Sequence, residues 1–325
     1  MKDQIITNKI LNWYDINKRS LPWRKRVSQT KKEFYTLVSE FMLQQTQVAT
    51  VIPYFNRFIK KIPNIEKLSK FEDKKLIKLW EGLGYYSRAR NLKKTAQIIV
   101  RDHNKKIPQD FLELKLLPGI GDYTASAISA IAFNKQMIPL DGNIERVLKR
   151  YLYLKKQIQI KKKNLIKKKK IFGTSIKRSS DYAQALMELG ALICKPVNPN
   201  CKECPLLKNC KSFKNKNFDL VKLRKKHKQK FYKLNVYKKN NQYLLIKNKK
   251  FNFLKNFNIF PMEELNNPKN FDKDLIFKMS NMNMNIKIEY KNKHNLDNNF
   301  YWIDPAKLQN YTLPTFTKKI VKFLE

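Results

Sequence analysis

Apolar residues recur at helical spacing from Ile5 to about Cys210, and almost nowhere in this stretch do apolar and polar residues alternate with a period of two. Pro, Gly and Asn separate the apolar segments, as expected between helices. This part of the chain is therefore predicted to be all-helical. The helices are expected near residues 5–17, 34–51, 73–80, 88–103, 111–117, 123–133, 143–153 and 181–192.

The pattern changes after residues 216–230, a polar and basic segment that is typical of a linker. Beyond it, strands are expected at 231–237, 243–246, 286–290 and 300–303, and a helix at 316–324. The sequence thus predicts a mostly α protein with a helical domain at 1–215, a linker at 216–230 and a small α+β domain at 231–325.

The amino-acid composition gives the chain a strong positive charge. The chain has 69 Lys and Arg against 26 Asp and Glu, a formal net charge of +43, which attracts polyanions such as nucleic acid. An AT-rich genome would also raise the lysine count, and composition does not separate the two causes. The lysine runs at 161–163 and 167–170 are either a solvated face or a phosphate contact.

No stretch approaches the ~20 apolar residues of a membrane span, and no secretory signal follows Met1. The chain is therefore expected to be a soluble protein of the cytoplasm, associated with the nucleoid, that has no membrane contact. It is also expected to be a monomer.

All four cysteines lie close together, spaced Cys194-x6-Cys201-x2-Cys204-x5-Cys210. In a reducing compartment such a group indicates metal ligation rather than disulfides. A single C-x2-C with outlying cysteines favours an iron-sulfur cluster. A structural zinc site with four cysteine ligands is the alternative.

The segment Leu117-Pro118-Gly119-Ile120-Gly121 separates two helical patterns. Its glycines permit a turn that presents N–H groups at the start of the second helix, an arrangement that binds phosphate. An ordinary helix-helix turn would have the same appearance.

The pattern also predicts the surroundings of two acidic residues. Glu40 shares a helix face with Leu37 and Phe41, so burial is expected to raise its pKa. Asp141 precedes a predicted helix and is expected to cap it, a role that is compatible with a second one in catalysis.

Several of these segments resemble DNA glycosylases of the helix-hairpin-helix superfamily: the cysteine spacing after residues 188–193, the hairpin with 122–128, and 140–147. Residues 19–24, 38–48 and 82–91 are similar to adenine glycosylases of the MutY type, and the resemblance spans roughly 5–215. It implies a helix-hairpin-helix core with a 4Fe-4S cluster on Cys194, Cys201, Cys204 and Cys210, and a C-terminal domain related to Nudix hydrolases.

The resemblance also implies an activity, the removal of adenine mispaired with 8-oxoguanine or guanine in double-stranded DNA. Glu40 would be the general acid, and Asp141 would stabilise the oxocarbenium ion. Tyr123 and Asn143 would support them. The adenine pocket would be lined by Arg19, Leu21, Trp23, Arg24 and Glu188, although core packing explains Leu21 and Trp23 equally well. DNA contacts would involve Gln45 and Tyr85 as wedges, Thr46 and Leu83 near the opposite base, and Gly119 and Gly121 at a phosphate.

Tyr123 stands where strand-cutting relatives carry a lysine that forms a Schiff base, and Glu145 stands where some adenine-specific relatives carry a second lysine. A monofunctional glycosylase is therefore expected. Two alternatives remain: a pyrimidine-lesion glycosylase with lyase activity, and a DNA-binding protein without catalysis.

The C-terminal domain departs from the MutY pattern. Residues 253–261 and 311–314 resemble the beginning and end of the family's reader domain, but the Phe-Ser-His loop that contacts 8-oxoguanine is not found, and only His294 lies between. Selectivity for 8-oxoguanine over guanine is therefore expected to be weaker than in relatives.

Overall fold

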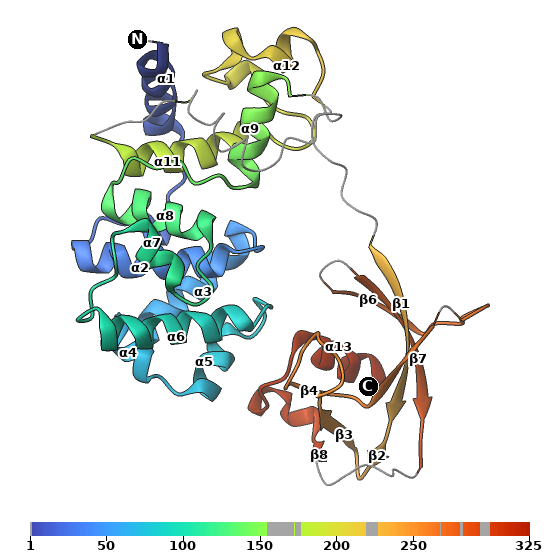
Figure 1. The fold of residues 1–325 in the computed structure, drawn as a ribbon. Coiled ribbons are helices and arrows are strands. Elements are labelled where there is room, and N and C mark those ends of the chain that lie inside the picture. The colour runs from blue at the N-terminus through green and yellow to red at the C-terminus, as the bar shows by residue number, and fades with distance from the viewer. Residues whose placement is uncertain are drawn as a thin grey trace. The chain divides into compact units, whose positions relative to one another are not determined.

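The computed structural model describes residues 2–154, 172, 177–218, 227–266, 268–279, 282–292 and 300–325. The chain divides into two compact units (Figure 1): the helical unit, formed by 1–73 with 85–223, and the sheet unit, formed by 74–84 with 224–325. Three features that the sequence analysis singled out lie outside the described residues: the lysine runs at 161–163 and 167–170, a part of the predicted linker, and His294.

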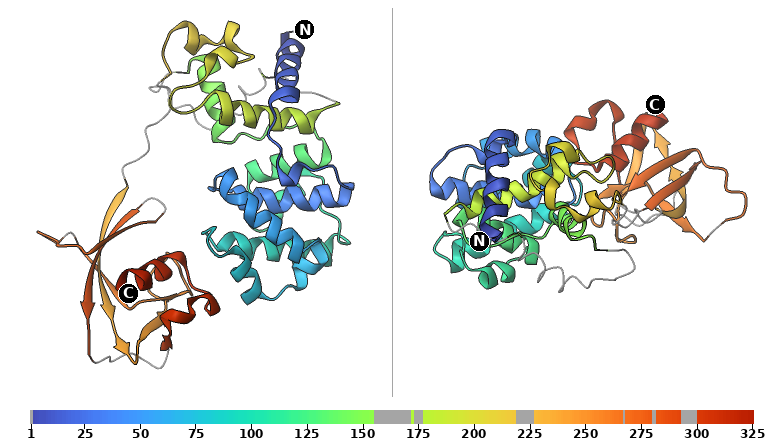
Figure 2. Two further views of the ribbon diagram at one scale, coloured as in Figure 1. Left: turned by 180° about the vertical axis from the view of Figure 1, so that it is seen from behind. Right: turned by 90° about the horizontal axis from the view of Figure 1, so that it is seen from above.

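The described part of the helical unit contains helices and no strand, as its apolar pattern predicts. The helices are α1 (Lys2–Asn17), α2 (Gln29–Leu43), α3 (Val48–Lys61), α4 (Ile65–Lys70), α6 (Ser87–Asp102), α7 (Phe111–Leu116), α8 (Asp122–Phe133), α9 (Gly142–Leu152), α11 (Ser179–Glu188) and α12 (Lys211–Lys214). Figure 2 shows the same helices from behind and from above. Helix α5 (Asp73–Trp80) groups, except for its first residue, with the sheet unit.

The prediction of a single helix over 34–51 is wrong, because α2 ends at Leu43 and α3 begins at Val48. Gln45 between them has a φ of 57°, a left-handed conformation that interrupts a right-handed helix. Helix α4 was not expected, although Asn64 accepts a hydrogen bond from the backbone N–H of Lys67 and so caps it.

Helix α2 runs through the centre of the helical unit and packs against α3, α6 and α8. Its buried side chains include Phe34, Leu37, Val38, Phe41 and Met42, spaced i, i+3, i+4, i+7 and i+8 as on one face of a helix. Burying each of these large apolar side chains stabilises the fold by roughly 1.5–3 kcal/mol. The helix is therefore a rigid support for any polar residue placed among them.

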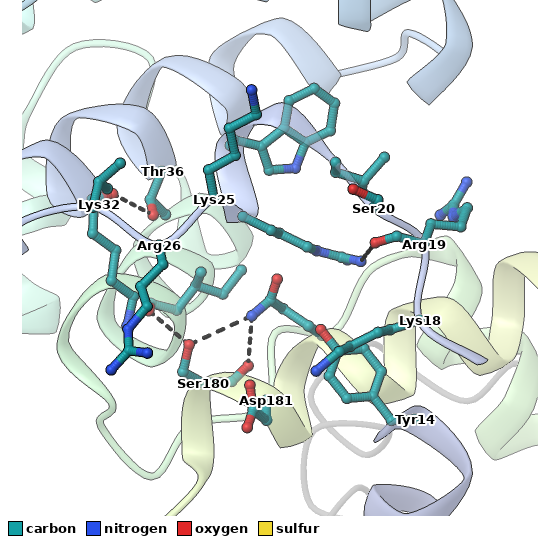
Figure 3. Close-up of a pocket in the computed structure, with 16 residues that line it drawn as sticks. Tyr14, Lys18, Arg19, Ser20, Lys25, Arg26, Lys32, Thr36, Ser180 and Asp181 are labelled. Atoms are coloured by element: carbon teal, nitrogen blue, oxygen red, sulfur yellow. Dashed lines mark hydrogen bonds between the residues drawn. The ribbon is translucent and has the colours of Figure 1, made fainter. Parts of the chain in front are cut away.

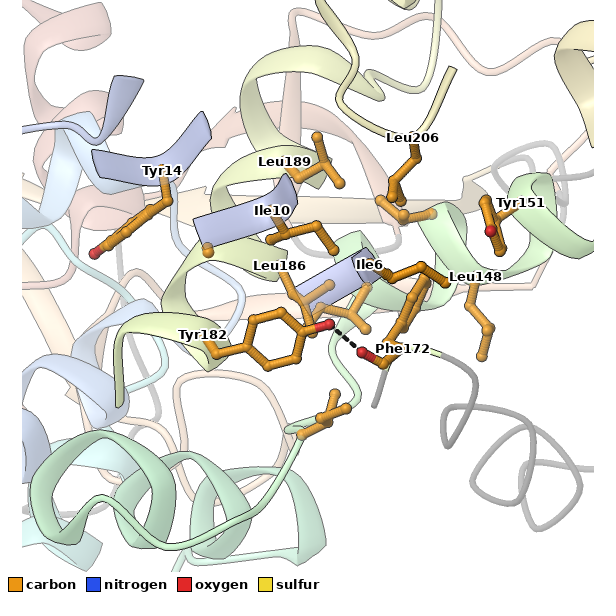
Figure 4. Packing of buried hydrophobic residues seen from close by; sticks show 14 of the residues in the cluster. Ile6, Ile10, Tyr14, Leu148, Tyr151, Phe172, Tyr182, Leu186, Leu189 and Leu206 are labelled. Atoms are coloured by element: carbon orange, nitrogen blue, oxygen red, sulfur yellow. Dashed lines mark hydrogen bonds between the residues drawn. The ribbon is translucent and has the colours of Figure 1, made fainter. Parts of the chain in front are cut away.

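A second apolar cluster joins α1, α9 and α11 around Phe172 (Figure 4). Ile10, Leu148 and Leu186 are fully buried in it, and the hydroxyl of Tyr182 donates a hydrogen bond to the carbonyl of Phe172. Cys194, Cys204 and Cys210 pack against the same cluster, so it anchors the cysteine loop beside α9.

In its described residues, the sheet unit contains two four-stranded sheets and a C-terminal helix. One sheet has the order β5-β1-β7-β6, with β1 and β7 parallel, and in the other β3 pairs with β2, β4 and β8. The elements are β1 (Lys228–Val236), β2 (Lys238–Lys239), β3 (Gln242–Lys247), β4 (Asn258–Ile259), β5 (Met262–Leu265), β6 (Leu275–Met279), β7 (Met282–Tyr290), β8 (Phe300–Ile303) and α13 (Thr315–Leu324). The four predicted strands and the helix are confirmed, whereas β2, β4, β5 and β6 were missed. Across the described residues, no helix combines the length and the apolar character that crossing a bilayer requires.

Candidate functional site

Glu40 lies on α2 among the apolar residues of the core, and it is only 5% exposed. Burial raises the pKa of its carboxyl group to about 7. A hydrogen bond from Tyr123 and the charge of Arg24 oppose this rise, whereas the negative charge of Asp141 adds to it. None of the described residues hydrogen-bonds to its second oxygen, Oε2. The group therefore holds a proton near neutral pH and has an oxygen available for a ligand.

Asp141 is the N-cap of α9, as the sequence predicts. Its Oδ1 accepts a hydrogen bond from the backbone N–H of Ile144 at 2.6 Å, and its Oδ2 accepts one from the side-chain amide of Asn143 at 2.9 Å. Burial raises the pKa of this carboxyl group, but these bonds and Arg146 act in the opposite direction by stabilising the anion. The two carboxyl groups thus have different surroundings.

Tyr123, on the first turn of α8, interacts with both acids. Burial raises its pKa well above the usual value, and the charges of Glu40 and Asp141 raise it further. The phenol therefore stays protonated and acts as a hydrogen-bond donor to Glu40.

Arg146 connects this group to the cysteine loop. Its Nη2 donates to Oδ1 of Asn143 at 2.8 Å and to the carbonyl of Gly190 at 2.7 Å, and its Nε donates to the carbonyl of Cys194 at 2.6 Å. Local sequence patterns did not single out this residue. Its position one turn after the capping residues was the available signal.

One cavity of about 590 Å³, here called the site cavity, brings most of the predicted residues together. This volume is typical of a pocket for a small organic ligand. Ten predicted residues line it: Arg19, Leu21, Trp23, Arg24, Glu40, Thr46, Tyr123, Asp141, Asn143 and Glu188. Gln45, Leu83, Tyr85, Gly119 and Gly121 are not among its lining residues.

The carboxylate of Glu188 is fully buried in the wall of the site cavity and holds two arginines. Nε and Nη2 of Arg19 donate to its two oxygens at 2.7 and 2.9 Å, and Nη2 of Arg24 donates to Oε1 at 2.9 Å. Bidentate pairs of this kind fix side-chain geometry. The arginines therefore form a rigid, donor-rich wall.

The hairpin between α7 and α8 depends on one of its glycines more than on the other. Gly119 has a φ of 80°, and an added Cβ would come within 2.9 Å of side-chain atoms of Asn91 and Phe41. Gly121 has a φ of −94° and no neighbour within 4 Å of such a Cβ. The turn therefore requires glycine at Gly119, whereas other residues also adopt the conformation of Gly121.

The two predicted wedges share a backbone conformation, and Arg88 contacts one of them and the residue before the other. Gln45 and Tyr85 are exposed and have positive φ values of 57° and 46°, which is uncommon outside glycine and concentrated at functional sites. The guanidinium of Arg88 lies 5.6 Å from the centre of the Tyr85 ring. Its Nη1 also donates to the carbonyls of Phe41, Met42 and Gln44 at 3.2, 2.7 and 2.5 Å. Arg88, a residue that the sequence analysis missed, thus holds the end of α2 beside Tyr85.

The four cysteines line a small hollow of about 30 Å³ together with Arg150 and apolar side chains. Burial raises the pKa of the Cys204 thiol to about 12, and the neighbouring cysteines contribute to the rise. Within the described residues, no three His, Cys, Asp or Glu side chains are arranged to hold a single metal ion. Thiols that surround a hollow in this way fit a multinuclear cluster, in which each cysteine binds a different iron, better than one zinc ion.

The comparisons with known proteins agree with this geometry. Residues 38–171 match the HhH-GPD superfamily of base excision DNA repair proteins. An adenine DNA glycosylase of Buchnera aphidicola subsp. Schizaphis graminum is 37% identical over 95% of this chain and 85% of its own length, and the one from rat is 40% identical over 62% of this chain and 40% of its own.

Solved structures are similar in fold. A thermostable thymine-DNA glycosylase covers 66% of this chain and 97% of its own chain, with a TM-score of 0.57 and 25% sequence identity. An endonuclease III in a non-covalent DNA complex covers 66% of this chain and 98% of its own chain, with a TM-score of 0.55 and 23% sequence identity. Together, the helix-hairpin-helix core, the paired acids and the relative that aligns along nearly the whole chain lead to one conclusion. The chain belongs to the adenine DNA glycosylase family of the helix-hairpin-helix superfamily.

Proposed function

We propose that this protein hydrolyses the N-glycosidic bond of adenine mispaired with 8-oxoguanine or guanine in duplex DNA and does not cut the strand. The observation that carries this proposal is that Glu40 and Asp141 line the same site cavity in different electrostatic surroundings. Its family membership supports the same activity.

Adenine leaves its sugar readily only when a ring nitrogen is protonated as the bond breaks. Glu40 supplies this proton, because its buried carboxyl group is still substantially protonated near pH 7. Its Oε2, which has no hydrogen-bond partner among the described residues, provides the contact to the base. Arg19 and Arg24, held by Glu188, bind and orient the extruded base in the site cavity.

Departure of the base leaves an oxocarbenium-like sugar. Asp141 stabilises this cation as a carboxylate, since its hydrogen bonds to Ile144 and Asn143 favour the anion. Water then completes the hydrolysis. Tyr123 cannot form an imine, and Glu145 forms an ion pair with Lys149, so neither position supplies an amine for strand cleavage.

The cysteine loop is proposed to hold a 4Fe-4S cluster on Cys194, Cys201, Cys204 and Cys210. The cluster would brace the loop, and Arg146 would transmit its position to Asn143. We also propose that the sheet unit is related to Nudix hydrolases and reads the opposite base, with reduced selectivity for 8-oxoguanine. The protein is further proposed to act as a monomer in the cytoplasm.

The test is release of labelled adenine from duplexes with 8-oxoguanine, guanine or thymine opposite the adenine. Glu40→Gln keeps the shape of the side chain but removes the acid, so the single-turnover rate is expected to fall by several orders of magnitude. Unchanged release by this variant would contradict the proposal. Strong borohydride trapping on a thymine glycol duplex would instead identify a lyase.

A further inference from the structure

A second cavity of about 840 Å³ adjoins the site cavity (Figure 3) and is here called the rear cavity. Seven residues line both cavities: Arg19, Leu21, Trp23, Arg24, Thr36, Ile131 and Gln184. These seven residues form the wall that separates the two cavities, here called the shared wall. The described function uses only the site cavity.

Helix α2 shows on which side the rear cavity lies. Glu40 lines the site cavity, Thr36 lines both cavities, and Lys32 lines the rear cavity. These positions are about one helical turn apart, so the hollows follow each other along α2 toward its N-terminus. At the opposite end, the side chain of Gln44 donates to the carbonyl of Gly119 in the hairpin at 3.2 Å. The rear cavity therefore lies toward the end of α2 that is remote from the hairpin.

This arrangement bears on the order in which products leave. In the proposed function, the base enters the site cavity from DNA that is bound at the hairpin. After hydrolysis the free base must either wait for the DNA to dissociate or leave by another side. We propose that the rear cavity binds the freed purine base and lets it leave while the abasic DNA is still bound. This inference rests on the proposed function.

The lining of the rear cavity suits a purine. Adenine presents ring-nitrogen acceptors and an aromatic face, and both interact favourably with cationic donors. In Figure 3, Arg26 and Lys32 lie on one side of the cavity and Lys18 lies on the other, with Ser180 and Asp181 between them. These side chains offer several hydrogen-bond donors and acceptors, so a neutral base can exchange one hydrogen-bond partner for the next as it moves through the rear cavity.

One side chain in the shared wall, Gln184, is weakly held. The amide of Gln184 donates to the carbonyl and hydroxyl of Ser180 at 3.2 and 3.5 Å, which are long bonds. Arg24, in contrast, is fixed by its ion pair with Glu188. Rotation of the Gln184 side chain would widen the connection between the two cavities.

Lys32→Trp and Val27→Trp test the proposal, because each places bulk in the rear cavity from a residue that does not line the site cavity. Lys31→Trp is the matched control, since Lys31 is exposed on the same helix and lines neither cavity. The first measurement is single-turnover cleavage of the mismatched duplex. The second is equilibrium dialysis of labelled free adenine against the enzyme bound to a duplex with an abasic-site analogue. Melting curves establish that each variant is folded.

Lys32→Trp and Val27→Trp are expected to cleave within about twofold of the unmodified protein, because the site cavity is untouched. Their product complexes are expected to bind adenine about tenfold or more weakly, while Lys31→Trp changes neither value. The inference is overturned if the unmodified complex takes up no adenine, if both filled variants bind it normally, or if inorganic phosphate displaces it. If the unmodified protein does not cleave the mismatch, the proposed function itself has failed.

Discussion

The hydrogen bond from Tyr123 to Glu40 predicts how the pH dependence of base removal responds to mutation. This bond stabilises the charged form of Glu40 and so lowers a pKa that burial has raised to about 7. Tyr123→Phe removes the hydroxyl and leaves the ring in place. A hydrogen bond to a charged group contributes about 1.5–3 kcal/mol, and one pKa unit corresponds to about 1.4 kcal/mol. The pKa of Glu40 should therefore rise by about one to two units.

The proton donor must be protonated, so activity is present below the pKa of Glu40 and is lost as the pH rises through it. In the unmodified protein this loss is expected near pH 7. In Tyr123→Phe it should move to about pH 8–9 if the loss of one hydrogen bond has the magnitude above. The assay is the single-turnover rate at enzyme concentrations below saturation, which reports the pKa of the free enzyme.

Tyr35→Phe is the control, because Tyr35 lies on the same helix as Glu40 but contacts the ring of Phe55. Its pH profile should match that of the unmodified protein. An alkaline limb that stays in place or moves to lower pH in Tyr123→Phe would refute the reasoning. A uniform fall in rate at every pH would show that Tyr123 contributes to the reaction in another way.

Two further predictions concern the scaffold around the site. Gly119→Ala should destabilise the protein by about 1–3 kcal/mol, because it combines a positive φ with close contacts to Asn91 and Phe41. Gly121→Ala has neither problem and should leave the melting temperature nearly unchanged; equal losses in the two variants would contradict this account. Arg88→Ala removes the donor to three carbonyls at the end of α2 and should cost about 1–3 kcal/mol in chemical denaturation, as expected when buried acceptors lose their hydrogen-bond partner. A change of less than about 1 kcal/mol would show that water replaces these bonds.

Local sequence signals predicted much of the molecule well. The helical period placed Glu40 among core residues, and the preference of Asp for N-caps placed Asp141 at the start of α9. Both depend on neighbours a few positions away, so the sequence alone contains the information. Short strands such as β4 have too few residues for a period of two to be visible, and they exist because they pair with β3.

The break between α2 and α3 shows the limit of such reasoning. Residues 34–51 have a continuous apolar pattern, and nothing local marks Gln45 as left-handed. The end of α2 is held instead by Arg88, which lies more than forty positions away in the chain. A contact between residues that are distant in sequence leaves no periodic trace.

The sequence by itself determined the fold class of the helical unit, the candidate acids and the set of cysteines, because periodicity, capping preference and ligand type are written in short segments. Only the tertiary structure decided that ten predicted residues share one cavity and that a second cavity adjoins it. It also decided that Arg146 joins Asn143 to the cysteine loop. These features depend on how separate helices pack, and packing is set by side-chain contacts across the whole unit rather than by any one segment.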